Sequence, residues 1–533
     1  MDHFSADYIL KSNTVFTGAN EKLLDGFVAV KENRIAAVGT EEQMQKWMGE
    51  KTKIYSYKDK LIMPGFCDSH VHLIFAALRA VSANVITAES EEEAVKMLYN
   101  FSKAQTGEWL FGFGWNYHYW KKKRLPTKKS LDKFFSDTPV ILFNEEMHSV
   151  WVNSRALELC QIDKDTPDPE GGEITKDQNG EPTGHLLEPS AIKLIIDKAF
   201  KMDPEKESQM IEEACRYIAG YGVTSISDVQ VFDFVKYEQY RKLENNNKLS
   251  TRIHFSPGID ESVEKLVELK NHYCSEKLMF SGAKGFVDGT AMANTGLLLE
   301  PYLDKPDYKG YALFDEEETR KKIVEFSKND IRVRLHACGD GAVRLALDMF
   351  ENVQNITGKK LRHTIEHIEN IHPVDISRFK KISVIPSVQP AHIWGVYETF
   401  KVKLGEERLK YAFAFKSLVT SGASIAFGTD CPIAVIDPMK GIYRAVTRDP
   451  GDGSCSSLNE NEKLTLSEAI LAYTMGSAYQ MYREKDLGSL EIGKLADIIV
   501  LDRNVFNVDN CELSEAKTIL TMMDGKIIFE DTY

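Results

Sequence analysis

The chain of 533 residues lacks several features that mark specialised classes of protein. It has eight cysteines but no C-x-x-C pair and no regular cysteine spacing, so neither a zinc knuckle nor a disulfide framework is indicated. No apolar run reaches the roughly 20 residues of a membrane span. Residues 1–7 contain neither a basic segment nor a long apolar one. From these absences we predict a cytoplasmic protein.

Positive charge is also scarce. Lysine and arginine number 66 against 80 aspartate and glutamate residues, which gives a formal net charge of −14. Phosphate backbones bind basic surfaces, so nucleic acid is not an expected partner. A membrane is not expected either, because no apolar run is long enough to span one. Hydrophobic residues make up 43% of the chain and charged residues 27%, which is typical of a globular protein. The length predicts two or three domains, and the sequence leaves the formation of a homo-oligomer open.

Short strands separated by Asn, Gly and charged turns are predicted in residues 1 to about 60. The same pattern returns at residues 496–501 and 526–529, where Asp524 and Gly525 form a turn signal. We therefore predict one β-sandwich built from residues 1–60 and 488–533, beside a central domain of residues 61–487.

The central domain is predicted to alternate strands and helices. Its first strand ends at His70, and seven others follow at 223–227, 252–255, 283–287, 331–335, 361–365, 382–385 and 424–428. Eight such units are the number in a TIM-like (β/α)8 barrel, an α/β fold whose active site lies at the carboxyl ends of the strands. Residues from about 75 to 205 break the alternation after strand one and are predicted to be an insertion.

Two histidines end the first strand. His70 and His72 follow a mostly apolar run from Lys60 to Phe66, and residues two apart on a strand face the same side. This arrangement is typical of metal ligands, although ordinary hydrogen bonding is also compatible with it. Further candidate ligands are predicted at the ends of later strands: Lys284, His336, His367 and Asp430. Their convergence on one rim favours a metal site.

Seven stretches make the chain resemble the amidohydrolase superfamily, most closely its amidohydrolase-3 (YtcJ-like) branch. They are PGFCDSHVH (64–72), KGFVDGT (284–290), HACGD (336–340), RHTIEH (362–367), QPAH (389–392), GTDCP (428–432) and GSLEIGKLAD (488–497). The resemblance covers nearly the whole chain. It implies a TIM-like barrel with a composite β-sandwich, and a hydrolase that depends on a divalent metal, commonly zinc, with one or two ions per chain.

The resemblance also implies a ligand set: His70, His72 and Asp430 for one ion, His336 and His367 for a second, and Lys284 between them. Lys284 would be carboxylated, because an ammonium cannot ligate a cation whereas a carbamate is an anionic oxygen ligand. His363 is an alternative metal ligand to His367. We prefer His367 because it ends the strand.

The implied chemistry is hydrolysis of a C–N bond, other than a peptide bond, in a small amide-type substrate. A metal ion lowers the pKa of water to about 7 and so supplies hydroxide at neutral pH. Asp430 is expected to accept the proton and return it to the leaving amine. Two alternatives stay open: deamination or cyclic amide or ester hydrolysis at the same site, and a non-catalytic relative that uses the barrel for assembly.

Substrate contacts are harder to assign from the sequence. Two stretches of the insertion, 111–120 and 144–153, have counterparts in the resembling branch. From them we select Trp115 as a wall for an apolar substrate group and His148 as a catalytic donor. His392 and Arg448 lie near strand-end loops and are further candidates for substrate contact. Core packing for Trp115, and structural hydrogen bonding for the other three, are alternatives.

Overall fold

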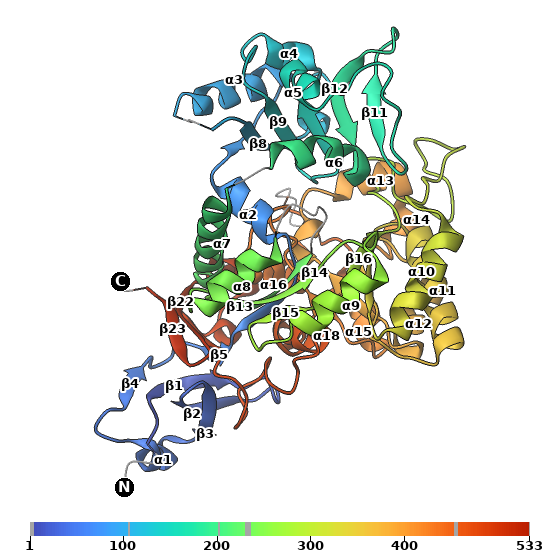
Figure 1. The fold of residues 1–533 in the computed structure, drawn as a ribbon. Coiled ribbons are helices and arrows are strands. Elements are labelled where there is room, and N and C mark those ends of the chain that lie inside the picture. The colour runs from blue at the N-terminus through green and yellow to red at the C-terminus, as the bar shows by residue number, and fades with distance from the viewer. Residues whose placement is uncertain (1–4, 105–106, 201–202, 230–235, 452–456, 532–533) are drawn as a thin grey trace.

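The computed structural model describes residues 5–104, 107–200, 203–229, 236–451 and 457–531. Residues 1–4, which belong to the segment 1–7 considered in the sequence analysis, lie outside these ranges. Figure 1 shows a sheet from both ends of the chain at the bottom, a barrel in the middle and a separate sheet at the top. In the part of the chain that is described, no helix combines the length and apolar character needed to cross a membrane.

Eight parallel strands of the described chain form the barrel. They are β6 (Phe66–Val71), β13 (Val223–Val229), β14 (Arg252–Ser256), β16 (Ala283–Phe286), β17 (Val333–Ala337), β18 (Thr364–His367), β19 (Ile385–Val388) and β20 (Ala426–Phe427). β6, β13 and β14 form one run, which β15 (Leu278–Phe280) extends, and β16 to β20 form another. Parallel bridges from Val71 to Cys431 and from Gly258 to Lys284 join the two runs. The expected α/β fold with a TIM-like barrel is thus confirmed.

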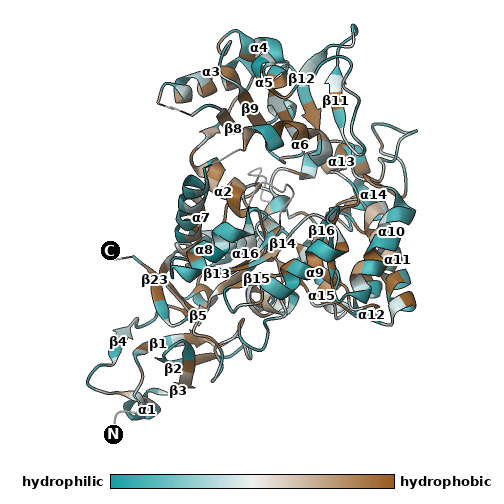
Figure 2. Cartoon of the chain, viewed as in Figure 1, coloured by the Kyte–Doolittle hydropathy of each residue, from teal (hydrophilic) through white to brown (hydrophobic). Residues whose placement is uncertain are grey.

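Helices lie between the barrel strands and after the last of them. The helix before β13 is α7 (Pro204–Ala219). It begins after Asp203, whose side chain accepts a hydrogen bond from Glu205 N. Figure 2 shows hydrophilic and hydrophobic residues side by side on these helices. The other helices around the barrel include α2 (Leu73–Ala80), α8 (Tyr237–Asn245), α9 (Val263–His272), α10 (Glu316–Lys328), α11 (Asp340–Thr357), α12 (Pro373–Lys381), α15 (Phe415–Thr420), α16 (Pro438–Thr447) and α17 (Leu466–Leu471).

Strands from both ends of the chain belong to one connected sheet, in the order β23-β22-β21-β5-β1-β2-β3, with β4 paired to β1. The strands are β1 (Tyr8–Phe16), β2 (Leu23–Lys31), β3 (Arg34–Gly39), β4 (Lys53–Ser56), β5 (Ile62–Pro64), β21 (Ile498–Leu501), β22 (Thr518–Met523) and β23 (Lys526–Glu530). We call it the terminal sheet. A two-layer sandwich made from the same residues stays a prediction.

Gly65 separates the terminal sheet from the barrel. The run from Lys60 to Phe66, which we predicted as a single strand, is divided there: β5 pairs with β1 and β21, whereas β6 pairs with β13. Gly65 N donates to Asp497 O, and a Cβ at this position would lie 2.5 Å from Thr224 Cγ2. Only glycine lets the backbone pass this closely from one sheet into the other.

The insertion after β6 forms a sheet of its own, in the order β11-β12-β10-β9-β8-β7. Its strands are β7 (Ala83–Asn84), β8 (Leu110–Trp115), β9 (Val140–Asn144), β10 (Ser149–Val152), β11 (Glu173–Lys176) and β12 (Pro182–Leu187). Its helices include α3 (Glu91–Ser102), α5 (Ser154–Leu159) and α6 (Glu188–Ala199). The turn between β9 and β10, residues 145–148, reaches the cavity described below.

A buried ion pair ties the barrel to the terminal sheet, and we expect its loss to destabilise the protein. Arg252, at the start of β14, donates to both carboxylate oxygens of Asp497, at 2.9 and 3.0 Å, and both side chains are buried. The Arg252→Ala variant leaves the Asp497 carboxylate buried without this partner, which costs about 3–5 kcal/mol. Urea denaturation should therefore show a clearly lower midpoint. The exposed pair of Arg155 and Glu158 is the control, because Arg155→Ala should cost about 1 kcal/mol or less; equal shifts would contradict this expectation.

Candidate metal and substrate site

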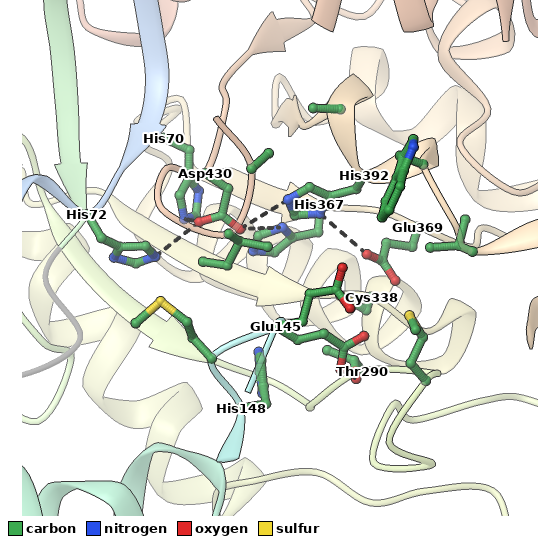
Figure 3. Close-up of a pocket in the computed structure, with 18 of the residues that line it drawn as sticks. His70, His72, Glu145, His148, Thr290, Cys338, His367, Glu369, His392 and Asp430 are labelled. Carbon is green, nitrogen blue, oxygen red and sulfur yellow. Dashed lines mark hydrogen bonds and ion pairs between the residues drawn. The ribbon is translucent and has the colours of Figure 1, made fainter. Parts of the chain in front are cut away.

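A cavity of about 500 Å³ lies between the carboxyl ends of the barrel strands and the 145–148 turn of the insertion. Eight of the residues selected from the sequence line it: His70, His72, His148, Lys284, His336, His367, His392 and Asp430. Figure 3 shows four of its five labelled histidines, His70, His72, His367 and His392, gathered around Asp430. Thus side chains from strands far apart in the sequence meet at one edge of the barrel.

Asp430 is the centre of this arrangement. Its Oδ1 lies 3.1 Å from Nε2 of His72 and 3.4 Å from Nε2 of His70. Its Oδ2 lies 3.7 Å from Nδ1 of His367 and 3.5 Å from Nε2 of His392. Burial raises the pKa of this carboxyl, but His70 and His72 outweigh burial and hold the pKa of Asp430 well below its usual range. Asp430 is therefore an anion at neutral pH.

In His70 and His72, the ring nitrogen that does not face Asp430 is Nδ1, and in both residues it contacts a hydrogen-bond acceptor. His70 Nδ1 lies 2.9 Å from Oε2 of Glu366, whose other oxygen accepts from Arg334 Nε at 2.7 Å. His72 Nδ1 donates to the carbonyl oxygen of Val229 at 2.6 Å. Burial lowers the pKa of His70 to about 4, so its ring is neutral. With the proton on Nδ1, the lone pair on Nε2 points at Asp430. Metal-binding histidines are commonly oriented in this way by an acceptor that binds the N–H of the other ring nitrogen.

These residues fit a divalent cation. In the described structure Asp430 Oδ1 is buried and has no hydrogen-bond donor, although two imidazole nitrogens face it. Lone pairs that face an anionic oxygen repel one another unless a cation lies between them. One ligand atom each from His70, His367 and Asp430 falls within 4.8 Å of the others. Imidazole and carboxylate donors suit zinc and similar divalent ions.

The remaining ligands predicted for a second ion lie beside this group. His336 Nε2 donates to the carbonyl oxygen of Gly289 at 3.1 Å, which leaves Nδ1 available, and its ring centroid is 4.4 Å from that of His367. Lys284 is 2% exposed and its Nζ has no hydrogen-bond partner among the described residues. Burial lowers the pKa of Lys284 to about 8. A buried amine of this kind is suited to carboxylation. His363 instead accepts from Val333 N and does not line the cavity.

Some residues at the cavity adopt a left-handed backbone conformation. Four lining or supporting residues other than glycine have positive φ: Met147 at 59°, Glu188 at 67°, His367 at 74° and Asp430 at 58°. Such conformations cost of order 1–3 kcal/mol each and persist where the surroundings enforce them, commonly at functional sites. The strain at His367 and Asp430 supports the assignment of this cavity as the working site of the protein.

The two other cavity histidines differ in their partners. His148 Nδ1 lies 2.7 Å from Glu188 Oε2, and this carboxylate, against the effect of burial, raises the pKa of His148 to about 9. His392 lies between Glu369 and Asp430, 3.6 and 3.5 Å from their carboxylate oxygens. Burial opposes the charged form of His392, but these two carboxylates raise its pKa. Both rings therefore lie against carboxylates that favour their charged form.

Two residues selected as substrate contacts lie elsewhere, and those predictions are wrong. Trp115 is 2% exposed, donates from Nε1 to Leu142 O and packs edge-on against Trp151. Gly114, with φ of 98°, and a register shift in β8 turn the indole into the core of the insertion. Arg448 is fully buried, and its guanidinium donates to three backbone carbonyls, those of residues 412, 413 and 458. It therefore stabilises a loop rather than contacting substrate.

Sequence reasoning missed three carboxylates that line the same cavity. Glu145 and Glu146 belong to the turn that carries His148, and Glu369 follows His367 by two residues. Burial raises the pKa of Glu146 to about 7, and its Oε2 accepts from Thr290 Oγ1 at 3.0 Å. The available signal was proximity in sequence: each lies within three residues of a histidine that had been selected. These carboxylates add hydrogen-bond acceptors on the substrate side.

A parallel barrel with histidines and an aspartate converging at the carboxyl ends of its strands defines the class of metal-dependent barrel enzymes. The model of the amidohydrolase family matches residues 55–529 of this chain. The chain therefore belongs to the amidohydrolase family, as the sequence resemblance implied. It is a hydrolase with a site for a divalent metal ion.

Individual relatives agree with this family. The chain is 31% identical over 513 residues to the putative amidohydrolase YtcJ of Bacillus subtilis, covering 94% of this chain and 96% of that protein. It is 27% identical to the N-substituted formamide deformylase of Arthrobacter pascens, covering 95% of each. Among solved structures, an uncharacterized metal-dependent hydrolase from Pyrococcus horikoshii matches with a TM-score of 0.77 and 28% identity, over 95% of this chain and 99% of that one.

Proposed function

We propose that this protein hydrolyses a C–N bond, other than a peptide bond, in a small amide-type substrate, with a divalent metal ion, zinc being the first candidate. The observation that carries the proposal is the buried Asp430 carboxylate, which faces the ring nitrogens of four histidines inside a cavity. The relation to an N-substituted formamide deformylase supports the choice of an amide.

The residues divide into metal ligands and groups that act on the substrate. The proposed ligands are His70, His72, Lys284, His336, His367 and Asp430. An ion held by them supplies Lewis-acid stabilisation of negative charge and lowers the pKa of water. Lys284 would ligate as a carbamate, because its buried amine has no hydrogen-bond partner among the described residues.

We assign the proton transfer of this reaction to Asp430. Its carboxylate is anionic at neutral pH and lines the cavity. We propose that it takes a proton from the attacking water and returns it to the nitrogen of the leaving amine as the C–N bond breaks. Amide and water are thereby converted to a carboxylic acid and an amine, with no other reactant. His148 would donate a hydrogen bond to the carbonyl oxygen of the substrate. His392, whose Nε2 lies 3.5 Å from Asp430 Oδ2, would also contact the substrate.

Metal analysis combined with a panel of substrates tests this function. The purified protein is expected to contain one or two divalent ions per chain, to lose activity with a chelator and to regain it when zinc is added. The panel contains N-formyl and N-acetyl amines, aminopurines or aminopyrimidines, and cyclic amides and lactones. Release of amine and acid from an N-acyl amine supports the proposal. Release of ammonia, or opening of a ring, indicates one of the alternative reactions at the same site. Turnover by a protein that holds no metal would contradict the proposal, and metal without turnover of any compound would favour the non-catalytic alternative.

A further inference from the structure

Three large apolar side chains that line the cavity are exposed. Tyr119, Trp394 and Val435 are 47%, 46% and 48% exposed, whereas His70 and Asp430 are buried. The three belong to separate segments: the insertion, the segment after β19 and the segment after β20. Single exposed apolar residues are common, but several that gather at one cavity indicate a surface that binds a ligand. We call Tyr119, Trp394 and Val435 the outer residues of the cavity.

The indole of Trp394 is held by the segment that follows α16. Gly451 has a φ of 78°, and a Cβ at this position would overlap Cδ1 and Nε1 of Trp394. Only glycine therefore lets the indole lie this close to the backbone. Gly395 N donates to Pro450 O at 2.9 Å, which ties the residue after Trp394 to the same segment. The ring is thus a supported part of the cavity wall.

Tyr119 reaches the same region from the insertion. It ends the 3₁₀-helix η2 (Tyr117–Tyr119), which Asn116 caps with its side chain. Asn116 Nδ2 also donates to Glu145 Oε2 at 2.8 Å, which ties η2 to the turn between β9 and β10. A Cβ on Gly395 would lie 3.3 Å from Tyr119 Oη, so the phenol lies against the segment after β19. The insertion and the barrel therefore each supply one aromatic ring to the same part of the cavity.

The cavity is larger than an amide group requires. Its volume is about 500 Å³, and cavities of about 300–1,000 Å³ hold ligands of drug size. An amide group has only a few non-hydrogen atoms, so space remains for a substituent. Phe286, Met292 and Ile433 add further apolar surface to the lining. An apolar substituent is favoured there, because its binding removes apolar surface from water. Arg444 also lines the cavity, but Asp449 balances its charge at 3.2 Å.

We propose that the outer residues Tyr119, Trp394 and Val435 form a subsite for an aromatic or branched apolar group of the substrate, and that this subsite determines which amides are preferred. The outer residues and Asp430 line one cavity, so an amide bound at Asp430 can place its substituent against them. An aryl group suits two aromatic walls, because rings attract one another in offset and edge-on contacts. This inference rests on the proposed function and adds the class of substrate to it.

The subsite should act mainly on substrate binding. The substituent contacts the same side chains in the bound substrate and in the transition state, so its contribution should appear in KM rather than in kcat. Replacement of a methyl group by a benzyl group adds a phenyl ring to be buried. We expect this change to raise kcat/KM by about 10–100-fold.

The test compares N-benzyl with N-methyl amides of one acid, and phenylacetyl with acetyl amides of one amine. The pair that shows the preference identifies the half of the amide that carries the apolar group. Trp394→Ala and Tyr119→Ala should each lower this preference by about 10-fold through KM, with metal content and hydrolysis of the small amide nearly unchanged. Trp394→Phe keeps an apolar ring and should keep most of the preference.

Three results would overturn the proposal. The first is an equal loss for large and small amides in the alanine variants, which would indicate a merely structural role. The second is a preference that both alanine variants leave unchanged. The third is a parent protein that prefers a substituent ending in a carboxylate over benzyl, which would assign this part of the cavity to the basic side chains that line it.

Tyr217→Ala is the matched control for Tyr119→Ala. Tyr217 lies on α7 and is exposed to the same degree as Tyr119, but it does not line the cavity. We expect its variant to keep kcat/KM for both members of each pair. A loss of preference as large as that in Tyr119→Ala would remove Tyr119 from the subsite.

Binding of the products tests the subsite without turnover. Isothermal titration calorimetry on the metal-loaded protein compares benzylamine with methylamine, and phenylacetate with acetate. At least one aromatic product should bind about 10-fold or more tightly than its small counterpart, and Trp394→Ala should remove the difference. If no amide is hydrolysed but this difference is found, the proposed function fails and the subsite stands. Aromatic products that bind no more tightly than the small ones, or no detectable binding of any product, would overturn the subsite.

Discussion

Replacing Asp430 with asparagine is expected to reduce turnover of the hydrolysed amide by roughly 10²–10⁴ while part of the metal stays bound. Asparagine keeps the size and one oxygen donor of aspartate but removes the charge and the proton-accepting group. The metal remains partly bound because the histidines that surround Asp430 are unchanged. Steady-state kinetics and metal analysis on the same preparation measure both quantities.

Asp340→Asn is the control for this substitution. Asp340 is buried to the same degree as Asp430, at 5% and 4% exposed, and also follows a barrel strand. Its Oδ1 accepts from Leu299 N at 3.0 Å, a bond that asparagine preserves, and it does not line the cavity. Its variant should retain turnover. Near-native turnover and full metal content in Asp430→Asn would remove Asp430 from the mechanism, and His148, which lines the same cavity, would be the next residue to test.

Replacing His70 with alanine is expected to remove metal and activity together. His70 is held through its Nδ1 by Glu366, which Arg334 holds in turn, so its Nε2 is preorganised toward Asp430. Substitution of such supporting partners alone commonly costs 10–100-fold in metal affinity or activity, so loss of the ligand itself should cost at least about 100-fold. Metal per chain after dialysis and kcat/KM are the measurements.

His363→Gln is the matched control for His70→Ala, because His363 is also a buried histidine of the barrel, but its Nδ1 accepts from Val333 N and it lies outside the cavity. It should retain metal even if it lowers stability. Lys284→Ala should follow His70→Ala if the lysine is a bridging carbamate. His70→Ala with full metal content would remove His70 from the ligand set.

The sequence determined the elements whose signals are local. α7 follows from Asp203 and Pro204 at its start and from one apolar face, and α10 follows from the cap formed by Asp315. Barrel strands were recognisable as apolar runs, and histidines at their ends suggested a metal site. The ends of strands were less certain: β18 begins at Thr364 rather than at 361, because the pairing partner and not the apolar run decides where a strand starts.

The tertiary structure decided everything that depends on contacts between distant segments. It sent Trp115 into the core through a register shift at Gly114, and it surrounded Arg448 with backbone carbonyls. Neither outcome is visible from a residue type, since a tryptophan or an arginine looks the same in a cavity wall and in a core.

The proposed metal site shows most clearly which features come from the sequence and which from tertiary contacts. The ligand types and their strand-end positions come from the sequence, but the group His70, His367 and Asp430 takes members from both of the ligand sets expected from the resemblance. The contact of Glu188 with His148 joins residues 40 positions apart. Which side chains meet is set by barrel closure and by the docking of the insertion, both non-local packing events, and the sequence alone specifies only which residues are available to meet.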